Sequence, residues 1–179
     1  MNHILANIKK ISAVSILAVV MVWSIVLSAG TVSAATINTT SLVNTSSSAN
    51  WAGYVATGGT YTGVTGSWII PTVSDTSTVG AADATWVGIG GVGTKNLIQA
   101  GTQAIVNSSG KISYQAWYEL LPGYSVRLPL TVSAGDTVTV SLSQTNNNHW
   151  IINFTDNTTG QNANKTVTYA SSLSSAEWI

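Results

Sequence analysis

Apolar and polar residues alternate over several short segments of this chain, and this period of two restricts the folds open to it. Valine and leucine alternate with threonine and serine over residues 137–142, and Trp150, Ile152 and Phe154 occupy every second position of a later segment. Successive side chains of a strand point to opposite faces, so the pattern is typical of strands with one buried face. Glycine-, serine- and asparagine-rich turns separate the segments, and roughly ten short strands at such spacing predict an all-β sandwich or barrel.

Two further segments are expected to be strands. Residues 126–132 place apolar side chains at even positions, with Arg127 and Pro129 at odd ones. Over residues 112–120, one face carries polar residues together with Trp117 and Glu119. Such a face fits a binding groove on a sheet. On the evidence of this segment alone, however, a row of solvent-facing side chains with the amphipathic indole lying flat on the surface is the better interpretation.

Charge is sparse and cysteine is absent. Six Lys and Arg residues stand against six Asp and Glu residues, and two of the basic ones, Lys9 and Lys10, lie within the first 35 positions. The rest of the chain therefore carries four basic and six acidic side chains, a net charge near −2 (4 − 6). Without a basic patch, nucleic acid is not an expected partner. Without disulfides, the domain must rest on the packing of its core.

Residues 1–35 have the features of a secretory signal peptide. Lys9 and Lys10 precede an apolar run from about 11 to 27, and the small residues Val-Ser-Ala-Ala at 32–35 suit a signal peptidase. We therefore expect a secreted, extracellular protein with no membrane contact after cleavage. The alternative is an uncleaved anchor, since the run is nearly long enough to span a bilayer.

The part of the chain after the signal peptide is expected to form one domain. Residues 36–49 are rich in serine, threonine and asparagine and predict a loose leader. Residues 50–179 hold the alternating segments, and a chain of this length is enough for one sizeable core.

Three apparent motifs are discounted. The glycine-rich run 88–93 fits a dinucleotide-binding pattern by letter, but that site needs a following helix, and residues 94–104 predict strand and turn instead. His149 stands beside Trp150, where a structural or solvated role is expected. Residues 156–160 lack the ligands of a calcium loop and predict a turn.

Five short motifs, taken in order, resemble the eqolisins, the family of glutamic peptidases. They are Asn50-Trp51-Ala52-Gly53-Tyr54, Trp86-Val87-Gly88-Ile89, Leu97-Ile98-Gln99-Ala100-Gly101, Ala116-Trp117-Tyr118-Glu119 and Ala176-Glu177-Trp178-Ile179. The resemblance covers residues 50–179. It implies a secreted acid endopeptidase that acts on proteins or peptides without a cofactor or metal. It also implies a concanavalin A-like sandwich of two bent antiparallel sheets.

The resemblance assigns roles residue by residue. Gln99 and Glu177 match the family's catalytic dyad, Trp86 and Glu119 match residues that flank it, and Trp117 matches a neighbouring aromatic. A carboxylic acid of ordinary pKa, about 4.3, stays partly ionised near pH 4, where a histidine base would be protonated. The amide of a glutamine does not titrate, so it would serve as an oxyanion donor throughout the acid range.

Two departures from the family pattern accompany the resemblance. The family commonly has an acidic residue directly after the Trp-Val-Gly-Ile motif, where this chain has Gly90. In the family, further strands follow the Glu-Trp-Ile motif, so we expect a sandwich that is truncated at its C-terminus and incomplete.

Two other functions compete with the peptidase. A secreted carbohydrate-binding or adhesive β-sandwich would use the abundant tryptophan and tyrosine as stacking surfaces, and fold alone does not decide between the two functions. An inactive, truncated peptidase homologue is the third interpretation, supported by Gly90 and by the missing strands.

Overall fold

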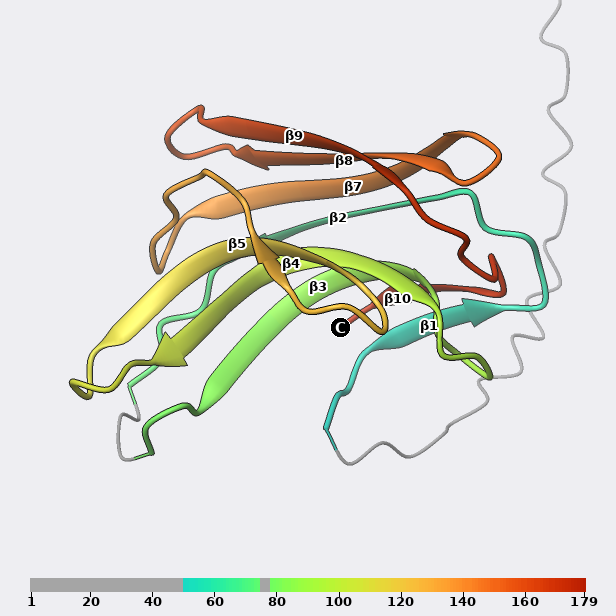
Figure 1. The fold of residues 1–179 in the computed structure, drawn as a ribbon. Helices are drawn as coiled ribbons and strands as arrows, with labels where there is room; N and C mark the ends of the chain where they lie inside the picture. Colours follow the sequence, from blue (N-terminus) through green and yellow to red (C-terminus); the bar gives the residue numbers. More distant parts are fainter. Residues whose placement is uncertain (1–49, 75–77) are drawn as a thin grey trace, which may run out of the picture. The chain divides into compact units, whose positions relative to one another are not determined.

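The computed structural model describes residues 50–74 and 78–179, and these form an antiparallel β-sandwich (Figure 1). The expected signal peptide (1–35) and leader (36–49) lie outside the described residues. The first sheet contains, in spatial order, β1 (Tyr54–Thr57), β10 (Ser175–Trp178), β3 (Ala82–Gly90), β4 (Leu97–Val106), β5 (Ile112–Leu120) and β6 (Val126–Arg127). The second contains β2 (Gly63–Ile69), β7 (Thr137–Asn146), β8 (His149–Asp156) and β9 (Asn162–Thr168). The prediction of an all-β sandwich is confirmed.

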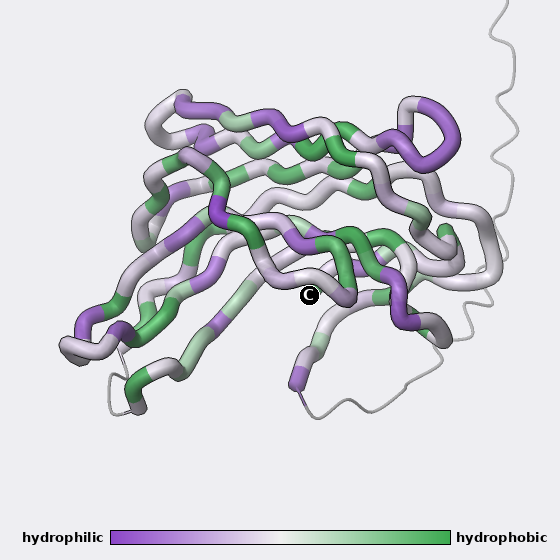
Figure 2. Tube along the Cα trace, in the orientation of Figure 1, coloured by the Kyte–Doolittle hydropathy of each residue, from purple (hydrophilic) through white to green (hydrophobic). Residues whose placement is uncertain are grey.

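The core lies between the two sheets, and the period of two seen in the sequence builds it. In β8, Trp150, Ile152 and Phe154 are fully buried, as the alternation predicts. Figure 2 shows the same alternation of hydrophobic and hydrophilic positions along the strands. The six-stranded sheet contributes to this core every second residue of its central strands: Val87, Ile89, Ile98, Ala100, Ala116 and Ala176.

The long strands β3, β4 and β5 bend, and their concave side faces away from the four-stranded sheet (Figure 1). Alternate residues of these strands therefore divide between two environments. Those at core positions pack against β2 and β7, which contact β3 and β4 directly. Their neighbours, one residue along the chain, lie on the concave face.

Two indole N–H groups bond the sheets to each other through β2. Trp178, on β10, donates from Nε1 to the backbone carbonyl of Thr65 at 2.8 Å. In the opposite direction, Trp68, on β2, donates to the hydroxyl of Thr102 on β4 at 2.9 Å. Each of these bonds joins one sheet to the other and so helps to fix how the two sheets lie together.

The expected strand over 126–132 is wrong in part. Only Val126–Arg127 pairs as a strand, β6, on the edge of the six-stranded sheet. The even-numbered residues Leu128, Leu130 and Val132 are nevertheless buried, as predicted. Pro129 has no N–H to donate to a ladder, so the segment buries its apolar side chains in an irregular conformation.

The structure also shows the places of two other discounted motifs, the 156–160 turn and His149. Asp156 is buried, and its carboxylate accepts bonds from the backbone N–H groups of Thr158 and Thr159 and from the Thr159 hydroxyl, so it closes a turn. His149 is exposed on β8 of the four-stranded sheet, within 3.2 Å of the Thr168 hydroxyl. Within the described ranges, no helix is long and apolar enough to cross a membrane.

Candidate active site

Four residues form one row across the concave face of the six-stranded sheet. Glu177 on β10 pairs with Gly88 on β3, Gly88 pairs with Gln99 on β4, and Gln99 pairs with Glu119 on β5. Directly opposed residues of antiparallel strands point to the same face. Because Ile98 lies in the core, Gln99 and the rest of its row point to the concave side. The two predicted catalytic residues are thus brought onto one face from positions far apart in the sequence.

Gly88 separates Glu177 from Gln99, and the side chains of its neighbours Leu97 and Trp86 lie over it. Neighbouring strands lie about 4.8 Å apart, so the backbones of Glu177 and Gln99 are about 10 Å apart. A Cβ at Gly88 would lie 2.8 Å from a methyl of Leu97 and 3.0 Å from the Trp86 ring. Only glycine fits at this position, because the Leu97 methyl and the Trp86 ring already occupy the space over it.

Gln99 is fixed by its neighbour on the other side. Its side-chain Nε2 donates to Oε2 of Glu119 at 2.5 Å. Gln99 is 7% exposed and Glu119 is partly buried. An amide nitrogen carries two protons, so one remains for another acceptor after the bond to Glu119 is made. Glu119 therefore sets the orientation of the Gln99 amide.

Glu177 is a carboxylic acid buried to 2% exposure. Burial raises its pKa above the ordinary value, and hydrogen bonds from the Ser175 hydroxyl and the Val92 backbone partly offset this rise. Ser175 Oγ lies 3.0 Å from Oε1 of Glu177. A raised pKa on a carboxyl group held by two donors is typical of a group that exchanges protons in a reaction.

A glycine-rich turn after β3 closes over the Glu177 carboxylate. Gly90, Gly91 and Gly93 all have positive φ angles of 90°, 98° and 72°, in agreement with the prediction that the glycines serve tight bends. A Cβ at Gly91 would lie 3.2 Å from Oε1 of Glu177. The turn thereby brings the backbone of Val92 against the carboxylate.

Gly90 occupies the position where an acidic residue is common in the family, and the surrounding atoms exclude one here. A Cβ at Gly90 would lie 2.5 Å from the Asn96 carbonyl oxygen, 2.7 Å from the Ser171 hydroxyl and 3.0 Å from the Ser172 hydroxyl. The two serine hydroxyls fill this space instead.

Tryptophan residues form the row next to the dyad. Trp86 pairs with Gly101, which pairs with Trp117, so a second glycine lies between two large side chains. Trp117 is 5% exposed, so the interpretation of its face as a solvent-facing row is wrong. Its Nε1 is buried and has no hydrogen-bond partner. A buried indole N–H normally has a partner, so this donor is an exception among the described residues.

Sequence reasoning missed Ser175 and the backbone of Val92. Both lie within reach of Glu177 only because β10 and the turn after β3 meet in the folded protein. The repeated serine before the Ala-Glu-Trp-Ile motif was the one available signal, and a serine-rich chain makes it weak.

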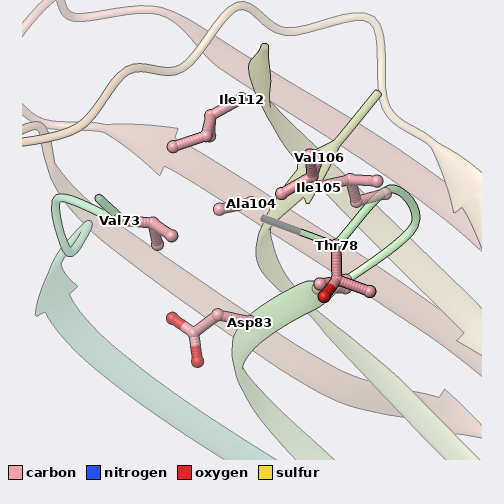
Figure 3. A pocket seen from close by; sticks show the side chains of 9 residues that line it. Val73, Thr78, Asp83, Ala104, Ile105, Val106 and Ile112 are labelled. Atoms are coloured by element: carbon pink, nitrogen blue, oxygen red, sulfur yellow. The ribbon is translucent and has the colours of Figure 1, made fainter. Parts of the chain in front are cut away.

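A cavity among the described residues lies away from Gln99 and Glu177. It has a volume of about 170 Å³ and lies at the far end of β3 and β4, where Asp83 is surrounded by the apolar side chains of Val73, Ala104 and Ile112, among others (Figure 3). Asp83 pairs with Ala104, five residues along β3 from Gly88. Asp83 also belongs to the core-facing set of β3, so this cavity is separate from the dyad.

Comparison with known proteins identifies the family. The model of the peptidase A4 family matches residues 49–179. Aspergillopepsin-2 of Aspergillus niger is 30% identical over 157 residues, which cover 74% of this chain and 55% of the relative. Scytalidopepsin B of Scytalidium lignicola is 30% identical over 125 residues, covering 69% and 46%. The chain thus spans about half the length of the curated relatives it matches.

Solved structures of the family have the same fold. A scytalido-glutamic peptidase with a transition state analog inhibitor superposes with a TM-score of 0.62 at 28% identity, covering 73% of this chain and 63% of that one. Aspergilloglutamic peptidase from Aspergillus niger gives a TM-score of 0.50 at 31% identity, covering 55% and 61%. The resemblance inferred from the five motifs is confirmed, and the chain belongs to the peptidase A4 family, the eqolisins.

Proposed function

We propose that the protein is a secreted acid endopeptidase in which Glu177 and Gln99 form the catalytic dyad. The observation that carries this proposal is their placement in one row of the concave face, on either side of Gly88. Glu177 lies on one side of Gly88 and Gln99 on the other, so a general base and an amide donor flank this position in the proposal. A scissile peptide bond and a water molecule between them would be in contact with both.

The reaction proceeds in two proton transfers. The Glu177 carboxylate removes a proton from water while the water oxygen attacks the carbonyl carbon of the peptide bond. The free N–H of Gln99 donates to the oxyanion of the tetrahedral intermediate. The protonated Glu177 then gives its proton to the amide nitrogen as the C–N bond breaks. The products are a carboxylic acid and an amine, and Glu177 returns to its starting state.

Glu119 and the tryptophans support this chemistry in different ways. Glu119 orients the Gln99 amide through the bond to Nε2. Trp86 and Trp117 form the neighbouring row, where they would contact the substrate chain beside the scissile bond.

Secretion and an acid working range complete the proposal. The segment 1–35 has the charge and hydropathy of a signal peptide, and cleavage near Ala34 or Ala35 would release the domain to the medium. N-terminal sequencing of the protein from culture medium tests this, and an intact Met1 in a membrane fraction would contradict it.

The proposed activity is tested with the protein that its own gene expresses and that is collected from the culture medium. Digestion of casein or haemoglobin should be fastest between about pH 2 and 5, the range around an ordinary glutamic acid. The raised pKa of Glu177 should place the maximum toward the upper part of this range, because the base acts in its ionised form. Chelators, serine-directed reagents and thiol reagents should leave the rate unchanged. A maximum at pH 7 or above, about three units from the ordinary pKa, would contradict the dyad mechanism. Binding to glycans without any proteolysis would favour the carbohydrate-binding alternative.

A further inference from the structure

Ser175 is fully buried on β10, two residues before Glu177 and on the same face of the strand. Its hydroxyl oxygen lies 3.0 Å from Oε1 of Glu177 and 3.4 Å from the backbone nitrogen of Val92. A serine hydroxyl has one proton to donate and lone pairs to accept with. The backbone N–H of Val92 can only donate, so Ser175 accepts from Val92 and gives its single proton to the carboxylate.

We propose that Ser175 is a positioning residue of the reaction, which holds the Glu177 carboxylate through the chain Val92 N–H to Ser175 O–H to Glu177 Oε1. The inference rests on the proposed function of Glu177. Ser175 is thereby added to the proposed site as a residue that donates its hydroxyl proton directly to the general base, Glu177. Hydrogen bonds that end on an ionised oxygen are shorter and stronger than neutral ones.

The chain of bonds favours the ionised form of Glu177, which is the form that accepts a proton from water. Burial opposes ionisation, because the charged carboxylate loses solvation. Ser175 and the Val92 backbone act in the other direction. Neither donor titrates in the acid range, so their effect on Glu177 is the same throughout it.

Few charged groups compete with this arrangement. Among the described residues of the surrounding elements, the glycine-rich turn brings Lys95, and β5 brings Glu119, which lies in the same row beyond Gly88 and Gln99. Asp83 is the charged residue of β3 and points to the opposite face, and β1 brings only the phenol of Tyr54. The pKa of Glu177 is therefore governed by desolvation, the largest influence, and by the two uncharged hydrogen-bond donors that oppose it.

The glycine-rich turn is what allows Val92 to take part. The positive φ angles of Gly90 and Gly91 turn the chain back over β10. A side chain at Gly91 would crowd the carboxylate, since its Cβ would lie 3.2 Å from Oε1 of Glu177. Ser174 donates to the Val92 carbonyl at 3.3 Å and so anchors the same residue from its other side.

The experiment uses the small number of glutamates in the chain. Glu119 and Glu177 are its two glutamates, so protein labelled with ¹³C-glutamate gives two carboxyl signals, which a Glu119→Gln variant assigns. In Ser175→Ala, the pKa of Glu177 should rise by about one to two units, the usual strength of a hydrogen bond to a charged group. The acid limb of kcat/KM should move to higher pH by the same amount.

Two further variants separate positioning from a merely structural role. Ser175→Thr keeps the hydroxyl and should restore the wild-type titration. Ser67→Ala removes a serine hydroxyl on β2 of the other sheet, one that bonds to Thr139, and should leave the Glu177 titration and the rate unchanged. If Ser175→Ala does not fold, Ser175→Cys, which keeps the shape with only a weak donor, takes its place.

The outcomes for the two proposals are distinct. An unchanged Glu177 titration in folded Ser175→Ala would overturn the inference about Ser175, whether or not the protein cleaves peptides. Absence of cleavage by the wild-type protein would overturn the proposed function, since the carboxyl titration needs no substrate.

Discussion

Glu177 and Gln99 lie opposite the same residue, Gly88, one from each neighbouring strand. The distance between their backbones is set by two strand spacings, and Gly88 itself contributes no side chain between them. Both side chains are nearly buried and lie on the concave face of the sheet, which makes the pair a candidate site. Substitutions at the pair and around it should therefore have separable effects on rate and on stability.

The two members of the dyad should be essential and non-additive. Glu177→Gln keeps the shape of the side chain but removes the base, and should lower kcat by about 10²- to 10⁴-fold. Gln99→Ala removes the oxyanion donor and should cost about 10²- to 10³-fold. Because both act on one transition state, the double variant should be about as slow as the slower single variant.

Matched controls for the dyad are available on the same sheet. Gln103 lies four residues from Gln99 on the same face of β4 and bonds to Gln115 at 3.4 Å. Gln103→Ala should retain most of the activity, and Glu119→Gln should be slower than wild type but faster than Glu177→Gln. Full activity of folded Glu177→Gln in steady-state kinetics would remove Glu177 from the mechanism.

The domain should gain stability from Glu177 at acid pH. Burial raises the pKa of Glu177 in the folded state above its value in the unfolded chain, so the folded protein binds this proton more tightly. The resulting stability is fully present below the unfolded pKa, about 4.3, and is lost as the pH rises through the folded pKa. Thermal unfolding of wild type and Glu177→Gln across this range measures the effect.

The comparison with Glu177→Gln isolates one group, because all other carboxyl groups titrate in both proteins. Wild-type Tm should fall relative to the variant as the pH rises. A wild-type Tm that instead gained on the variant with rising pH would show that the folded state favours the charged carboxylate.

Alanine at Gly91 should impair catalysis more than alanine at Gly93. Both glycines have positive φ, so either substitution should cost about 1–2 kcal/mol of stability. Only a Cβ at Gly91 approaches Glu177, at 3.2 Å, whereas a Cβ at Gly93 meets nothing within 4 Å. We expect similar losses of Tm and a lower kcat for Gly91→Ala alone. Equal kcat in the two variants would argue against contact between the turn and the carboxylate.

Removal of the Trp178 indole should loosen the contact between the sheets. Trp178→Phe leaves the Thr65 carbonyl without its donor and should lower the free energy of unfolding by about 0.5–1.5 kcal/mol. Tyr54→Phe, on the neighbouring strand and 82% exposed, is the control and should change it by less than about 0.5 kcal/mol. Denaturant titration of both variants measures this, and equal values would exclude a stabilising role for the bond.

The sequence alone determined the fold class and the limits of several strands. The alternation over residues 112–120 matches β5, and Trp150, Ile152 and Phe154 are buried as predicted. These features are local, since a strand with one buried face imposes a period of two on its own residues. Over 126–132 the same period located the buried residues but not the conformation, because the missing N–H of Pro129 prevents a ladder.

Only the tertiary structure decided how the site is assembled. The sequence nominated Gln99 and Glu177 through a family resemblance, but the register of three strands puts Gly88 between them. Likewise, nothing local to Ser175 indicates that its hydroxyl will meet both Glu177 and the backbone of Val92. Such contacts depend on strand register and on the path of a turn. Both are set by the packing of the whole sandwich and not by the residues that make the contact.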